Sequence, residues 1–234
     1  MGQWELLRAT LIALGHRVSL MPGRPGLPDM VFAARSATVV GGRVLGARYR
    51  SAEPWGQGQT SAVLAWFAER GFGARLEPVF AHEGERDLLP AGPRLLAAMG
   101  PLTETAAHVE AQAFLGLPVV ALELADPRFP HLGAALAVLG ERTAAYYPGA
   151  FTPGALRRLT RVFPERIEVE ESDALAFGLD VVCDGRNVVM GDRTPGFAAL
   201  LSGRGFRPIE LDLSEFAAHG AGARSCVLEL RAAR

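Results

Sequence analysis

Residues 83–124 read EGERDLLPAGPRLLAAMGPLTETAAHVEAQAFLGLPVVALEL, and this stretch contains every part of one structural unit. Two strand-like runs, residues 83–89 and 94–99, flank an Ala-Gly turn. The spacing of apolar residues over 104–115 predicts a helix, and the apolar run 118–124 predicts a further strand. The stretch therefore predicts the order strand, turn, strand, helix, strand.

The same order recurs along the chain with a period of roughly 40 residues, which indicates a repeated supersecondary unit. One unit begins with strand-like runs over 30–40 and 43–49, and two more have their turns at Gly140 and at Asp184-Gly185. A fifth unit is divided between the two ends of the chain. Its strand comes from the C-terminal run 225–230, and its helix and second strand come from residues 4–14 and 16–21.

Such a divided unit closes a ring, and closure removes exposed sheet edges. We therefore predict an α/β fold of pseudo-fivefold ββαβ repeats closed by the termini, forming a single domain over residues 1–234. An open α/β sandwich whose hairpins repeat by chance is the alternative fold.

Composition narrows the classes of function. Of the 234 residues 49% are apolar, and 24 basic residues face 25 acidic ones, so neither a disordered chain nor a strongly basic nucleic-acid binder is expected. Every basic residue is an arginine, which excludes lysine chemistry. Two cysteines, the lack of a signal-like N-terminus and the lack of an apolar run of about 18 residues predict a cytoplasmic protein without a membrane segment.

Loops that carry acidic or histidine residues fall at matching positions of the repeats. They contain Asp29, the motif Glu83-Gly84-Glu85-Arg86-Asp87, His131, Asp180, and Ser225-Cys226. In a ring of such units these loops converge on the axis. A cysteine that meets a distant histidine there is a candidate nucleophile pair.

Several motifs resemble one known family in order along nearly the whole chain. They are Gly26-Leu27-Pro28-Asp29-Met30-Val31-Phe32, Glu83-Gly84-Glu85-Arg86-Asp87, Asp126-Pro127-Arg128-Phe129-Pro130-His131-Leu132, Tyr146-Tyr147-Pro148-Gly149-Ala150-Phe151, Phe177-Gly178-Leu179 with Ser214-Glu215, and Cys226-Val227-Leu228-Glu229-Leu230. The chain resembles the dimethylargininases, arginine deiminases and amidinotransferases, and it is most similar to bacterial dimethylargininase-like proteins. The resemblance implies the five-bladed pentein propeller. It also implies that the N-terminal strand which completes the divided blade in most relatives is absent here.

The resemblance implies hydrolysis or transfer at a guanidinium carbon. In the family a cysteine thiolate attacks that carbon, a histidine moves protons, and carboxylates hold the guanidinium. His131 stands at the position of the catalytic histidine, and Asp29, Glu83 and Asp87 stand at acidic positions. No cofactor and no metal are implied, although zinc at His82, Glu83 and Asp87 remains an alternative.

The sequence also departs from the family pattern. Ungapped alignment of the last segment puts Ser225 at the nucleophile position and Cys226 one residue further, on the opposite face of a strand unless a bulge re-aims it. Arg35 stands where relatives have Asp or Asn, and Asp180 replaces an Asn. Gly133 stands where the family pattern has a guanidinium-holding Asp, and Leu102-Thr103 replaces an Arg-Thr pair.

Two hypotheses of function follow, and both are kept. The first is a diverged, catalytically weak or silent relative that binds a small molecule in the old guanidine site, and this ligand is anionic if Arg35, Arg86 and Arg128 lie near the mouth. The second is an active hydrolase of arginine-type substrates that uses Cys226 with His131. An interaction role and a homodimer are further expectations.

Overall fold

The computed structural model describes residues 2–50 and 54–230, and its sheets repeat one pattern. Each of four sheets has three strands, in which the first two pair antiparallel and the third adds parallel to the second. The sheets are β1 (Ala37–Val40), β2 (Arg43–Gly46) and β3 (Arg75–Leu76); β4 (Leu88–Ala91), β5 (Arg94–Met99) and β6 (Val119–Glu123); β7 (Leu136–Val138), β8 (Thr143–Tyr146) and β9 (Glu165–Glu168); β10 (Val182–Cys183), β11 (Asn187–Gly191) and β12 (Arg207–Leu211).

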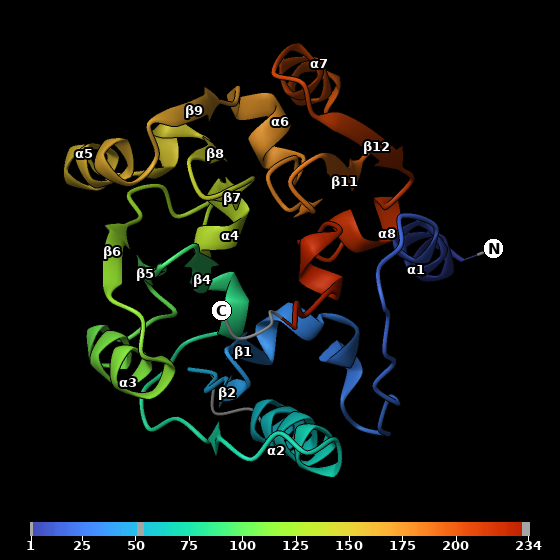
Figure 1. Cartoon of the computed structure of the whole chain (residues 1–234), viewed down its shortest axis with the longest axis vertical. Coiled ribbons are helices and arrows are strands. Elements are labelled where there is room, and N and C mark those ends of the chain that lie inside the picture. Colours follow the sequence, from blue (N-terminus) through green and yellow to red (C-terminus); the bar gives the residue numbers. More distant parts are fainter. Residues whose placement is uncertain (1, 51–53, 231–234) are drawn as a thin grey trace.

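A long helix on the outside of the ring connects the second and third strands of each sheet (Figure 1). These helices are α2 (Pro54–Glu69), α3 (Thr105–Leu115), α5 (Pro153–Val162) and α7 (Pro195–Gly203). Pro153 and Pro195 stand in the first turn of their helices, where the missing N–H costs no hydrogen bond. The predicted ββαβ unit is therefore confirmed in four copies.

The fifth position of the ring is occupied by both ends of the described chain. Helix α1 (Gln3–Ala13) lies outside it, and its Leu7 and Leu11 share a buried cluster with Ala223 and with Cys226 from the C-terminal segment. Gln3 also binds the short helix α8 (Ser214–Ala217), since its Nε2 donates to the Ser214 hydroxyl at 2.9 Å. The termini thus close the ring, as the repeat pattern predicts.

The prediction of strands at the two ends of the chain was wrong. Residues 16–21 and 227–230 lie outside every sheet, and Arg224–Cys226 forms a 3-10 turn, η5. An extended segment becomes a strand only when a neighbour pairs with its backbone, and no such ladder forms here among residues 2–50 and 54–230.

The predicted strand over 30–40 was also too long. Its first part forms two 3-10 turns, η1 (Pro28–Val31) and η2 (Ala33–Arg35), and only β1 remains extended. Pro28 fixes the first turn, and the backbone N–H groups of Phe32 and Arg35 then bond three residues back.

Comparable short helical turns precede the other inner strands and carry the residues of interest. They are η3 (Gly84–Arg86) before β4 and α4 (Leu132–Ala135) before β7, whereas a turn after α6 (Glu171–Leu175) leads to β10. A further 3-10 turn, η4 (Pro148–Ala150), follows β8.

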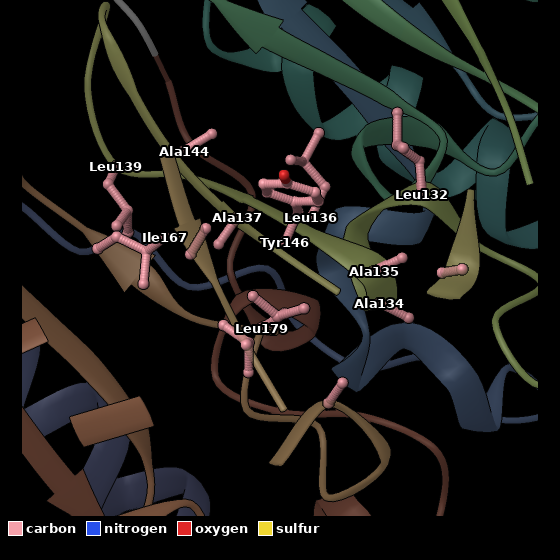
Figure 2. Close-up of a cluster of buried hydrophobic side chains, with 14 of the residues drawn as sticks. Leu132, Ala134, Ala135, Leu136, Ala137, Leu139, Ala144, Tyr146, Ile167 and Leu179 are labelled. Carbon is pink, nitrogen blue, oxygen red and sulfur yellow. The ribbon is translucent and has the colours of Figure 1, made fainter. Parts of the chain in front are cut away.

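The largest buried cluster joins three of the four sheets. Figure 2 shows Leu132, Ala134 and Ala135 of α4 continuing into Leu136 and Ala137 of β7, with Leu179 from the next unit beside them. Leu132 and Ala135 are fully buried, so α4 is held rigidly against the core. This packing positions His131, the residue that precedes α4. No helix of the described residues is long and apolar enough to cross a bilayer.

Candidate functional site

The acidic motif is held by the 3-10 turn η3. Gly84 has a φ of +54°, and a Cβ there would lie 2.6 Å from the Ala34 carbonyl oxygen, so only glycine fits between the two turns. The Glu83 backbone N–H donates to Asp87 Oδ2 at 3.0 Å across this turn. The Asp87 carboxylate is therefore fixed just before β4, and the Glu83 and Asp87 side chains are both almost completely buried.

His131 lies directly beside these carboxylates. Its Nδ1 donates to Asp87 Oδ1 at 3.0 Å, and its Nε2 lies 3.7 Å from Glu83 Oε2. Although burial opposes the charge of Asp87, its contact with His131 and its backbone hydrogen bond hold its pKa below the usual range. Asp87 thus orients the imidazole and leaves Nε2 facing Glu83.

The guanidinium of Arg35 completes this cluster. Its Nε and Nη2 donate to Glu83 Oε2 at 2.8 and 2.6 Å, and its Nη1 lies 3.8 Å from Asp29 Oδ2. Burial works against the charged form, but the charge and hydrogen bonds of Glu83 raise the pKa of Arg35 above its usual value. Two of the three acids expected at the site, Asp29 and Glu83, therefore hold a guanidinium that belongs to the chain itself, and His131 lies against the same Glu83 carboxylate.

Two other carboxylates of the loops predicted to reach the axis, Glu85 and Asp180, make different ion pairs. Glu85 pairs with Arg224, and Asp180 pairs with Arg86.

Ser225 belongs to a second buried network. Its hydroxyl donates to Asp180 Oδ2 at 2.5 Å and accepts from Arg86 Nη1 at 2.7 Å, and its backbone N–H donates to Asp180 Oδ1 at 2.9 Å. Asp180 is completely buried and also accepts from the backbone N–H of Gly222 at 2.7 Å. Among the described residues, no hydrogen bond joins Ser225 to His131.

Cys226 lies apart from both networks. Its side chain packs against the apolar cluster that contains Leu7 and Ala223. Burial, with a further contribution from the charge of Asp180, raises the pKa of the Cys226 thiol to about 12. Since residues 224–226 form a turn, the predicted alternation of strand faces does not apply, but the thiol still makes no hydrogen bond to His131 among the residues that the structure describes.

We expect both cysteines to resist alkylation in the folded protein. Because the pKa of the Cys226 thiol is about 12, only about one Cys226 thiol in ten thousand is ionised at pH 8. Burial also raises the pKa of the Cys183 thiol, to about 11. Iodoacetamide should therefore label the folded chain at least about a hundredfold more slowly than the chain unfolded in guanidinium chloride. Mass spectrometry of timed samples measures this, and rapid labelling of Cys226 in the folded chain would contradict it.

Arg128 pairs with carboxylates other than those that surround Arg35 and His131. Its guanidinium binds Asp126 with a distance of 2.6 Å to Oδ2 and pairs with Glu171, and about half of its side chain is exposed. Arg35, Arg86 and Arg128 are thus all paired with carboxylates. An anionic ligand would therefore have to compete with these carboxylates for the arginines.

Arg224 was missed as a site residue, and Arg86 was considered only as a cation near the mouth of the site. Arg86 and Arg224 contribute buried guanidiniums close to Ser225, and each lies next to a predicted site position. The available signal was an arginine directly before a predicted site residue, Arg86 before Asp87 and Arg224 before Ser225. No three His, Cys, Asp or Glu side chains of residues 2–50 and 54–230 come together as a metal site, including those around His82.

His82 gives the fold a pH dependence. Burial lowers its pKa to about 4, well below the value of about 6.5 in an unfolded chain. Above pH 6.5 the residue is neutral in both states, and as the pH falls from 6.5 towards 4 the unfolded chain binds the proton first. His82 should therefore reduce the free energy of unfolding by up to about 1.4 kcal/mol per pH unit in this window. Urea unfolding of His82→Gln should have a flatter pH profile than the parent chain, whereas the exposed His219→Gln should not.

Comparison with known proteins gives consistent similarities. No protein-family model matches the chain. The N(G),N(G)-dimethylarginine dimethylaminohydrolase of Mycobacterium tuberculosis is 44% identical over 232 residues, which are 98% of this chain and 75% of that protein. A bifunctional arginine dihydrolase/ornithine cyclodeaminase of Nostoc is 32% identical over 234 residues, 98% of this chain but 32% of that longer protein.

Among solved structures, the N-terminal domain of a cyanobacterial arginine dihydrolase has a similar fold. A cysteine-to-serine variant of that domain, bound to substrate, superposes with a TM-score of 0.92 at 32% identity, over 99% of this chain and 86% of that domain.

Proposed function

The chain belongs to the family of arginine-type amidino hydrolases that includes dimethylargininases and arginine dihydrolases and has the pentein fold, and from this premise we propose that it is a catalytically silent member. Its guanidine site holds Arg35 of the same chain in place of a substrate. The observation that carries the proposal is the pairing of Arg35 with Glu83, 2.6 Å apart and directly beside His131.

The position of the nucleophile supports this proposal. Family chemistry needs a cysteine thiolate, and the alignment puts Ser225 at that position. A serine hydroxyl is almost never ionised at neutral pH, and it needs an adjacent base. Both the hydroxyl and the backbone N–H of Ser225 are bound to Asp180, while His131 is bound to Asp87. The similar arginine dihydrolase domain was obtained bound to substrate as a cysteine-to-serine variant.

The occupied acidic pair supports the proposal independently. A substrate guanidinium would have to replace Arg35 at Glu83 or stand beside it. Two guanidiniums about 4 Å apart repel each other by about 4 kcal/mol at an effective dielectric constant of 20. This energy corresponds to a loss of about a thousandfold in affinity.

The purified chain should therefore not hydrolyse family substrates. Incubated with L-arginine or asymmetric dimethylarginine, it should release no ammonia, citrulline or dimethylamine above a heat-denatured control. Loss of a nucleophile lowers the rate on the order of a millionfold. A chromatographic assay with hours of incubation therefore distinguishes an active hydrolase from a chain without a nucleophile. Turnover that survives further purification and follows the chain in gel filtration would overturn the proposal.

An active hydrolase is the second candidate, favoured by the 44% identity to a dimethylarginine dimethylaminohydrolase. It requires Cys226 to ionise and reach the imidazole of His131, although the pKa of its thiol is about 12. On this candidate Cys226→Ala abolishes turnover, Ser225→Ala preserves it, and a haloacetamidine labels Cys226 irreversibly. On our proposal the reagent leaves Cys226 unlabelled.

A further inference from the structure

The two ends of the ring are formed by different parts of each repeat. The four hairpin turns lie at one end, which we call the hairpin end, because they border a single hollow at Gly41, Gly92, Gly140 and Gly185. The first strands β1, β4, β7 and β10 run toward it from the turns of the guanidine site, which therefore lie at the opposite end, the site end. The second and third strands run from the hairpin end to the site end, since they are antiparallel to the first (Figure 1).

An arginine follows each hairpin turn, at equivalent positions of the four repeats. Arg43 and Arg94 begin β2 and β5, and Arg142 and Arg186 directly precede β8 and β11. All four residues are exposed. Further exposed arginines at the hairpin end stand at or just before the start of third strands, namely Arg75, Arg204 and Arg207.

These arginines are only weakly neutralised by the chain itself. Arg142 Nε lies 3.6 Å from Glu165 Oε1, and both side chains are mostly exposed. Among residues 2–50 and 54–230, the other six exposed arginines of the hairpin end make no ion pair with a carboxylate. Glu141 and Asp184 also lie in the hairpin turns, but the arginines outnumber the carboxylates at this end. The hairpin end is therefore basic.

Glutamates stand at the other ends of the third strands. In each repeat an apolar residue, which pairs with the second strand, is followed by a glutamate: Leu76-Glu77, Leu122-Glu123, Ile167-Glu168 and Ile209-Glu210. All four glutamates are exposed, and none is in an ion pair within the part of the chain that the structure describes. The site end thus carries carboxylates in the same fourfold repetition as the arginines of the hairpin end.

The two sets of charges match in position around the ring. Arg94 begins β5, and Glu123 pairs with Met99 at the end of that strand, so the two charges are about 17 Å apart along the sheet. Neighbouring strands are only about 5 Å apart, so arginines on second strands and glutamates on third strands lie at similar distances from the ring axis. A second ring placed on the same axis therefore brings the arginines of one ring over the glutamates of the other.

From this separation and match of charges, we propose that copies of the chain stack end to end, with the hairpin end of one copy on the site end of the next. A second copy fits this surface because the chain is nearly neutral overall, with 24 basic and 25 acidic residues, and it supplies both partners of each ion pair. The contact joins two different surfaces, so it continues beyond two copies. This inference does not depend on the proposed function.

Sedimentation velocity at several chain concentrations tests the stacking. At an ionic strength of about 0.01 M, where charges act over about 30 Å, the weight-average mass should rise with concentration to at least about twice that of one chain. At about 1 M, where they act over about 3 Å, the chain should sediment as a single copy. Exposed ion pairs are individually weak, so the association should be reversible on dilution.

Charge reversal identifies the surfaces. Arg94→Glu with Arg186→Glu makes both ends acidic, and Glu123→Arg with Glu210→Arg makes both ends basic. Each double variant alone should associate at least about tenfold more weakly than the parent chain, because like charges then face each other. Mixed in equal amounts, the two variants should associate again, since acidic and basic ends alternate. Arg8→Glu with Arg157→Glu is the charge-matched control on the outer helices α1 and α5, and it should associate like the parent chain.

Several outcomes would overturn the proposal: a parent chain that stays single at low ionic strength, a mass that stops at two copies, a mixture that does not associate, or a control that loses association equally. So would a single parent chain that binds heparin through Arg94 and Arg186, because these arginines would then serve a polyanion. Circular dichroism checks folding. If a reversed variant does not fold, Arg94→Gln with Arg186→Gln and Glu123→Gln with Glu210→Gln should each still weaken the association.

Discussion

Arg35→Asn should raise the affinity of the chain for L-arginine by about a thousandfold. The substitution removes the guanidinium that pairs with Glu83 and Asp29 and leaves both carboxylates in place, with Glu83 beside His131. An external guanidinium can then make the same ion pairs without repulsion. The gain follows from the estimate of about 4 kcal/mol for two guanidiniums about 4 Å apart.

The same substitution should lower stability in the absence of ligand. Glu83 is buried and loses its counter-ion, which costs roughly 2 kcal/mol, less than for a fully buried pair because about a quarter of the Arg35 side chain is exposed. L-arginine at about a hundred times its dissociation constant should restore about 2.7 kcal/mol. Calorimetric titration and thermal melts measure both effects.

Three controls make this test specific. L-citrulline, which lacks the positive charge, should neither bind Arg35→Asn tightly nor stabilise it. Arg35→Lys keeps a cation beside Glu83 and should gain no affinity for arginine, and the surface variant Arg128→Asn should behave like the parent chain. A folded Arg35→Asn chain that ignores arginine would show that Arg35 does not occupy a guanidine site.

Asp180→Ala should destabilise the fold by about 4 kcal/mol, since removal of one partner from a buried ion pair typically costs 3–5 kcal/mol. Asp180 is completely buried and accepts hydrogen bonds from Arg86, from Ser225 and from the backbone of Gly222. Its loss leaves the Arg86 guanidinium charged and buried without a counter-ion. For a chain of this length the melting temperature should fall by roughly 10 °C.

A double-variant cycle tests the cause of this loss. Arg86→Met combined with Asp180→Ala removes the unpaired charge and should be more stable than Asp180→Ala alone. Asp126→Ala breaks the exposed pair with Arg128 and should cost less than about 1 kcal/mol. If Asp180→Ala costs no more than Asp126→Ala, the buried network does not stabilise the ring.

Local patterns were sufficient to predict the repeating unit. The turn at Gly92, the apolar spacing of residues 104–115 and the apolar run 118–124 are each short-range signals, and the structure has a hairpin, α3 and β6 there. Positions at matching points of the repeats also predicted that Glu83, Asp87 and His131 would meet, because equivalent loops of a closed ring converge on its axis.

The direction and partner of each buried charge could not be predicted in this way. Arg86 and Asp180 are 94 residues apart in the chain, and Arg224 and Glu85 are 139 residues apart. No local pattern distinguishes Arg35 bound to Glu83 from Arg35 bound to Glu85. The choice depends on which carboxylate the assembled turns bring within reach and on the desolvation that each pairing requires.

Residue types and their spacing were thus enough to predict the ββαβ repeat, the closed ring and the loops that carry the acidic and histidine residues. The reason is that short-range backbone preferences and the burial of apolar faces act within each unit. The partners of Arg35, Ser225 and Cys226 depended on contacts between units and between the two ends of the chain. Those contacts place Arg35 beside Glu83, bind Ser225 to Asp180 and bury the Cys226 thiol in the apolar cluster, because a buried charge or polar group must find its partner wherever the folded chain provides one.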